Sequence, residues 1–149
     1  MIQIGDSYSM SITITAEMVS SYGTLVGDFN PIHFDAEYAK TTRFGKNIVH
    51  GMLLLGYFSN IVGNHLPGNG TIYSIQAIRF AKPVYINETV TFIVSVKAIQ
   101  PEKSKITLDN VCKNQAGEVV MEGESKVYNY TPSLYLNQAT DFTPSDQLS

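Results

Sequence analysis

Apolar and polar residues recur along this chain with periods that predict its elements. From Tyr8 to Ile14 they alternate, which is the pattern of a half-buried strand. Thr15 can cap a helix, and the apolar residues after it recur at helical spacing and would form one face. Gly27 would end this helix, and Asp35 would cap a short second helix that runs to about Lys40. The apolar residues of the first helix are Met18, Val19, Tyr22, Leu25 and Val26.

The longest apolar stretch lies between Gly51 and Gly63. Its large side chains surround a helical wheel instead of lining one side, which is typical of a buried helix. A helix that crosses a bilayer needs about 20 apolar residues, and this one is too short. The stretch therefore predicts a buried central helix. Its apolar residues are Met52, Leu53, Leu54, Leu55, Tyr57, Phe58, Ile61 and Val62.

Four strand-like runs follow a loop at 66–70, and they cover residues 71–80, 88–99, 105–113 and 118–128. Short turns between such runs indicate antiparallel hairpins. The whole order predicts an α+β domain whose antiparallel sheet wraps around the central helix. We expect a single domain at residues 1–130, followed by a polar C-terminal tail at 131–149 that is loosely ordered beyond Leu136.

Composition narrows the class of protein. The chain has 149 residues, of which 44% are apolar and 15% charged, and its net charge is −3. These values fit one soluble domain with its own core, and the low charge suggests surface buried against another subunit. No basic patch points to nucleic acid, and no apolar leader or membrane span is evident. The single Cys112 excludes an internal disulfide and fits a reducing cytoplasm.

Polar residues that could take part in catalysis lie close together just after the first helix. Asp28, Asn30 and His33 fall within six residues, beside Gly27 and Pro31. Because Pro31 pushes Asn30 out of the helical region, we expect these groups on a stiff, irregular turn. A bridging water would require the nearest polar atoms of Asp28 and His33 to lie within about 5 Å. Asp and Asn also favour ordinary turns, so a structural role for Asp28 stays open as the alternative.

The string Gly27-Asp28-x-Asn30-Pro31-x-His33 resembles the signature of the MaoC-like family of (R)-specific enoyl-CoA hydratases. Tyr22, Leu25 and Ala39 fit the flanking positions, whereas Val26 stands where the family usually has a small residue. The similarity extends from about residue 4 to residue 128 and includes Ile48-Val-His-Gly-Met52. It implies a hot dog fold, a homodimer, and reversible syn hydration of trans-2-enoyl-CoA to (R)-3-hydroxyacyl-CoA.

The resemblance assigns roles to the motif. Asp28 would be the principal base, and His33 its partner in holding the water and moving protons. Asn30 would hold the turn or the water in place. Gly51, where the buried helix begins, would donate its N–H to the thioester oxygen, although it could instead only ease helix entry. His50 would either position substrate and water or pack beside the turn.

Ser59, on the buried helix, either lines the acyl pocket or is a tolerated core hydroxyl. We expect no metal, because His33, His50 and His65 lack the tight spacing of ligand sets, and no organic cofactor. No phosphate loop and no nucleophilic serine elbow is present. The basic residues that would meet CoA phosphates stay undecided among Lys40, Arg43, Lys82, Lys103 and Lys105.

Three other functions stay open. A 3-hydroxyacyl-ACP dehydratase would run the reaction on a different carrier, which nothing in the sequence distinguishes. A hot dog acyl-CoA thioesterase would not need the Asp-x-Asn-Pro-x-His string, so the motif disfavours it. A binding module without activity would have no reason to keep both Asp28 and His33.

Overall fold

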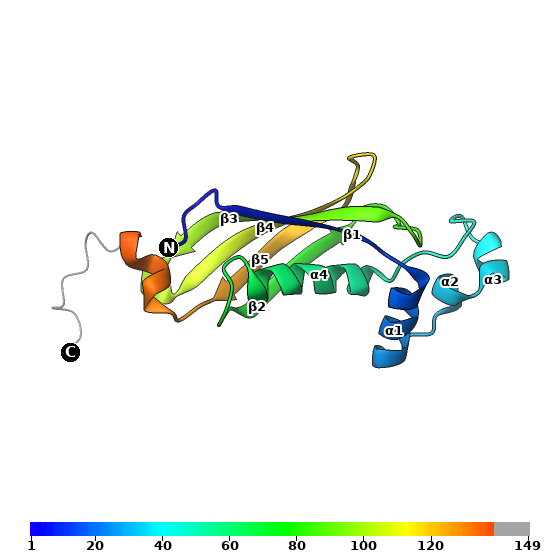
Figure 1. Cartoon of the computed structure of the whole chain (residues 1–149), viewed down its shortest axis with the longest axis horizontal. Helices are drawn as coiled ribbons and strands as arrows, with labels where there is room; N and C mark the ends of the chain where they lie inside the picture. Colours follow the sequence, from blue (N-terminus) through cyan, green and yellow to red (C-terminus); the bar gives the residue numbers. More distant parts are fainter. Residues whose placement is uncertain (139–149) are drawn as a thin grey trace.

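The structure is a computed structural model, and it describes residues 1–138. Figure 1 shows a sheet with α4 lying along one face, and α1, α2 and α3 gathered beyond the end where α4 begins. The strands are β1 (Ser7–Thr13), β2 (Ile72–Phe80), β3 (Thr89–Gln100), β4 (Lys105–Asn114) and β5 (Val119–Tyr128). The helices are α1 (Ala16–Val26), α2 (Pro31–Phe34), α3 (Ala36–Lys40) and α4 (Gly51–Asn64), with 3-10 turns at Pro101–Lys103 and Pro132–Gln138.

The five strands form one antiparallel sheet in the order β1-β3-β4-β5-β2. The expected hairpins between β3, β4 and β5 are confirmed. The expectation of a hairpin between β2 and β3 is wrong, because β2 pairs with β5 and forms an edge of the sheet. The reason lies in the segment 81–88, where Pro83 interrupts the ladder and the chain crosses to the far side of β4 before β3 begins.

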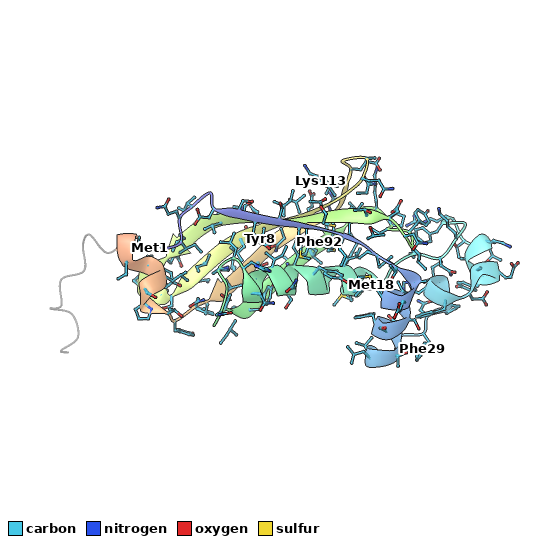
Figure 2. The ribbon with its side chains drawn as sticks, viewed as in Figure 1. Met1, Tyr8, Met18, Phe29, Phe92 and Lys113 are labelled. Atoms are coloured by element: carbon cyan, nitrogen blue, oxygen red, sulfur yellow. The ribbon has the colours of Figure 1, made fainter. Side chains whose placement is uncertain are left out.

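Helix α4 packs on the sheet through one side. Leu54, Phe58, Ile61 and Val62 are buried, and the ring of Phe58 meets Phe92 of β3 edge-on at 5.2 Å between centroids. Figure 2 shows Phe92 between the sheet and α4. The expectation that the sheet covers every face of this helix is wrong for the single chain. Met52 is 56% exposed, and Gly56 and Ser59 on the same side are exposed as well. Five strands cover one side of a helix and leave the other without a partner layer.

Helix boundaries follow the capping residues that the sequence offers. Thr15 caps α1 by accepting the Met18 N–H at 3.2 Å, and Gly27 ends it with a left-handed φ of 78°. Asp35 caps α3 by accepting the Tyr38 N–H at 3.0 Å. The motif turn is more regular than expected, because Pro31 opens a helical turn, α2, that Asn30 caps. Proline is favoured at the first helical position because its missing N–H would have no partner there.

The chain beyond residue 130 packs on the domain as far as the structure describes it. Ile2 donates its N–H to Leu134 O at 2.9 Å, and buried Tyr135 donates its hydroxyl to Asn129 O at 2.7 Å. The expected loose order beyond Leu136 falls largely on residues 139–149, outside the described residues. Within residues 1–138, no helix is long and apolar enough to cross a membrane.

Candidate active site

Two segments far apart in sequence meet at the candidate site. The turn after α1 carries Asp28, α2 carries His33, and the start of α4 carries His50 and Gly51. The loop before α4 is fastened to α2, because Asn47 donates its side-chain N–H groups to Ile32 O at 3.0 Å and to Asp35 O at 3.1 Å. This clamp holds the beginning of α4 against the motif turn.

Asp28, His33 and His50 form one cluster. A carboxylate oxygen and one ring nitrogen from each histidine all lie within 4.8 Å of one another. For Asp28 and His33, that separation is within the reach of a single bridging water. The Asp28 side chain is 47% exposed, whereas His50 is 2% exposed, so the carboxylate is open to solvent and one imidazole lies beneath it.

The hydrogen bonds of His33 fix which of its nitrogens is a base. Its Nδ1 lies 2.8 Å from Ile48 O, and a carbonyl oxygen can only accept, so Nδ1 carries the proton. The Nε2 of neutral His33 is then left with a free lone pair. The imidazole is thereby oriented by the backbone beside Gly51, and its second nitrogen can accept a proton from substrate or water.

His50 is held in a similar way. Its Nε2 donates to the backbone oxygen of Asp28 at 3.1 Å and lies 3.9 Å from the Asp28 carboxylate. Its Nδ1 is buried and has no hydrogen-bond partner within residues 1–138. The pKa of His50 is lowered from its ordinary value of 6.5, chiefly because burial disfavours the charged ring. His50 is therefore a neutral ring that supports the turn from below.

Gly51 is the first residue of α4. The His50 carbonyl accepts the N–H groups of Leu53 and Leu54, and within residues 1–138 no acceptor meets the Gly51 N–H. A free N–H at a helix N-terminus carries partial positive charge. A Cβ at this position would lie 2.6 Å from the ring of Phe80, so only glycine fits here without displacing that ring.

A pocket of about 390 Å³ opens beside these groups. His33 and Gly51 line it together with apolar side chains from the α4 region and the segment after β2. A volume of this size is in the range of small-molecule sites. Apolar walls with a few convergent polar groups suit a ligand that has a polar reactive centre and an apolar chain.

Asn30 and Ser59, the remaining predicted site residues, do not line this pocket. Asn30 Oδ1 accepts the Ile32 N–H at 3.3 Å, so this side chain holds the turn. Ser59 lies eight residues along α4 from Gly51, about 12 Å at 1.5 Å per residue. It lines a different hollow of about 290 Å³, with Tyr73 and Gln76 of β2. Met52 lines both cavities, which makes them neighbours along α4.

The clustering of Asp28, His33 and His50 also gives a donor set of the kind that divalent metals use. The sequence spacing does not reveal this donor set, because His50 lies 17 residues after His33. His65, in contrast, stacks on Tyr8 with ring centroids 4.2 Å apart. The expectation that the chain uses no metal stays a prediction.

Two residues of the site could not be predicted from the sequence pattern. Phe80, on the exposed edge strand β2, covers Gly51, and Asn47 clamps the loop to α2. Nothing in the spacing of Phe80 distinguishes it from the other apolar residues of its strand. Asn47 stands in a loop of ordinary composition, so only the fold reveals its two acceptors.

Known proteins are similar to this chain in sequence and in fold. A family model described as MaoC like domain matches residues 2–116. The chain belongs to the MaoC-like family. An (R)-specific enoyl-CoA hydratase of Rhodospirillum rubrum is 42% identical over 126 residues, which cover 85% of this chain and 87% of that protein. An (R)-specific enoyl-CoA hydratase of Aeromonas caviae is 38% identical over 126 residues, 85% of this chain and 94% of that one.

Solved MaoC-like structures agree with the fold. The (R)-hydratase from A. caviae involved in PHA biosynthesis superposes with a TM-score of 0.83 at 38% identity, covering 86% of this chain and 97% of that chain. The unliganded R-hydratase from Pseudomonas aeruginosa gives a TM-score of 0.80 at 33% identity, covering 86% and 82%. The expected α+β hot dog fold is therefore confirmed for this MaoC-like chain.

Proposed function

We propose that this protein is an (R)-specific enoyl-CoA hydratase, a hydro-lyase that adds water reversibly to trans-2-enoyl-CoA. The observation that carries the proposal is that His33 and Gly51 line one pocket, while the Asp28 carboxylate lies at its border, within reach of a water that His33 can also hold. Within residues 1–138, the Gly51 N–H has no acceptor. A base, a proton carrier and an oxyanion donor are what hydration of an enoyl thioester needs.

Asp28 is the principal base in this mechanism. A water held between Asp28 and His33 loses a proton as its oxygen forms a bond to C3 of the enoyl group. The C2–C3 double bond opens toward the thioester, and C2 gains a proton from the same pair of side chains. Because one water and one pair of groups serve both transfers, both additions occur on one face of the double bond. The face that meets the water sets the configuration at C3, and the similarity to (R)-specific enoyl-CoA hydratases assigns the product as the (R)-3-hydroxyacyl thioester.

Gly51 stabilises the intermediate charge. As C3 is attacked, negative charge develops on the thioester oxygen, and the free N–H at the start of α4 can donate to it. Asn30 positions the turn by capping α2, and His50 positions it by bonding to Asp28 O. Ser59 lines the neighbouring hollow beside α4, which a longer acyl chain would reach past Met52.

The decisive experiment follows the absorbance of the enoyl thioester with crotonyl-CoA and an octenoyl-CoA. We expect the absorbance to fall, and the product to be oxidised by an (R)-specific and not by an (S)-specific dehydrogenase. Release of free CoA thiol would identify a thioesterase instead. Binding of acyl-CoA without either reaction would identify a binding module, and strong preference for an acyl carrier protein would identify a 3-hydroxyacyl-ACP dehydratase.

We also propose that the protein is a homodimer. The edge strand β2 has large apolar side chains facing solvent, with Ile72 at 59% and Ile75 at 51% exposure. It adjoins the uncovered side of α4 through the hollow that Met52 and Tyr73 share. A long apolar edge strand is an aggregation risk unless it is paired, and a second copy would pair it under twofold symmetry. Light scattering should give twice the mass of the chain, and Ile75→Asp should give the single mass.

Three further expectations complete the proposal. A cytoplasmic location fits the single, buried Cys112. The domain at residues 1–130 with a tail at 131–149, and the absence of nucleic acid and membrane partners, stay predictions. Fractionation of cells and limited proteolysis from the C-terminus would test them.

A further inference from the structure

The loop between α3 and α4 carries two cations with no carboxylate partner. Within residues 1–138, ion pairs engage Lys40, Lys82, Arg79 and Lys97, whereas Arg43 and Lys46 form none. Lys103, Lys105, Lys113 and Lys126 form no ion pair within the described residues either, so the lack of a carboxylate partner does not by itself distinguish Arg43 and Lys46. Solvated surface lysines are common, so position and rigidity have to decide whether this pair has a ligand.

Both cations are held over aromatic rings. The Arg43 guanidinium carbon lies 4.9 Å from the centroid of Phe44, and Lys46 Nζ lies 4.5 Å from the centroid of Tyr85. Such contacts attract a cation without neutralising its charge. The Tyr85 side chain is tied to the loop, because its hydroxyl donates to the backbone O of Phe44 at 3.1 Å. The loop therefore presents two restrained, unneutralised charges.

Arg43 belongs to the same pocket as the reactive groups. It lines the 390 Å³ pocket together with His33, Gly51 and Lys82. The Lys82 charge is engaged by Glu118 at 2.6 Å, and this ion pair lowers the pKa of the Glu118 carboxyl. Arg43 is thus the unneutralised cation of the pocket wall. The other candidates, Lys103 and Lys105, do not line it.

We propose that Arg43 and Lys46 hold the phosphates of coenzyme A, which makes CoA and not an acyl carrier protein the carrier of the acyl group. This inference rests on the proposed function and names its substrate more narrowly. A guanidinium matches phosphate oxygens bidentately, and a lysine adds a point charge. CoA brings a pyrophosphate and a 3′-phosphate, whereas the arm of a carrier protein brings a single phosphodiester beside a protein surface.

The test compares crotonyl-CoA, crotonyl-pantetheine and crotonyl-acyl carrier protein with the whole protein, Arg43→Ala, the double variant Arg43→Ala/Lys46→Ala, and Lys103→Ala as control. Arg43→Ala should lower kcat/KM on crotonyl-CoA roughly 10-fold or more, because it removes charge-assisted hydrogen bonds to phosphate. The loss should appear in KM, with kcat kept, and should deepen in the double variant. Added salt should raise KM for the natural protein and not for the double variant.

Crotonyl-pantetheine carries no phosphate, so its kcat/KM should be the same for every variant. Equal kcat/KM of Arg43→Ala and the natural protein on crotonyl-CoA would overturn the proposal. A higher kcat/KM on the carrier protein than on CoA would overturn it as well. If no thioester is hydrated, the proposed function fails, and calorimetric binding of free CoA decides the subsite: binding that Arg43→Ala abolishes supports it, and unchanged binding overturns it.

Discussion

His33 and His50 stack on one another, with ring centroids 3.8 Å apart and planes inclined by 29°. One ring bonds to the carbonyl of Ile48 and the other to the carbonyl of Asp28, so each histidine is fixed by the segment that carries the other. The stack joins the motif turn to the start of α4. A substitution of either histidine should therefore change the positions of both Asp28 and Gly51.

The first prediction concerns the acid–base pair. Asp28→Asn keeps an oxygen for the Asn30 N–H, which Asp28 accepts at 3.2 Å, so the fold should survive. Loss of the base should lower the hydration rate by roughly 10²–10⁴, and His33→Ala should do comparable damage. The double variant should be little worse than either single one, since groups acting on one water fail together. Additive losses in steady-state rates would contradict a shared water.

The second prediction concerns Gly51. Gly51→Ala would put a methyl group 2.6 Å from the half-exposed Phe80 ring, so the ring should turn into the pocket and turnover should fall. Gly51→Ala combined with Phe80→Ala removes the collision and should recover turnover, whereas Gly51→Pro removes the N–H and should not recover it in either background. Gly56→Ala, with nothing within 4 Å, is the matched control. Full activity of the proline variant would exclude the N–H as a donor.

The third prediction concerns pH. The folded-state pKa of His50 lies below its ordinary 6.5 because of burial, so below pH 6.5 the unfolded chain binds more protons than the folded one. The free energy of unfolding should therefore fall as the pH is lowered from 7 through the folded-state pKa. His50→Gln should flatten this part of the profile in urea titrations. An unchanged slope in that variant would mean that His50 is not its source.

Part of this site follows from the sequence and part does not. Local signals determine the caps at Thr15, Gly27 and Asp35, and the spacing of Asp28 and His33 brings them to one turn. The position of His50 depends on a 17-residue connection, so its stack on His33 follows only from the packed fold. Strand order is non-local in the same way, which is why β2 is an edge strand and α4 is half covered.

The fourth prediction concerns the polar chain under α4. Ser125 donates to Gln76 Oε1 at 2.9 Å and accepts from Asn110, and both Ser125 and Asn110 are fully buried. Ser125→Ala leaves the side chains of Gln76 and Asn110 without this hydrogen-bond partner. The substitution should lower the free energy of unfolding by about 1–3 kcal/mol. Ser11→Ala breaks an exposed pair with Thr91 and should change it by less than about 0.5 kcal/mol. Equal costs would mean that water replaces the serine.

The burial of Cys112 has a practical consequence at the bench. Its side chain is fully enclosed, and burial raises the pKa of its thiol to about 12, so almost no thiolate forms near neutral pH. It is also the single cysteine of the chain. A chromogenic thiol reagent added to a reaction will therefore report CoA released from the substrate, with no background from the folded protein, and hydrolysis and hydration can be read in one cuvette.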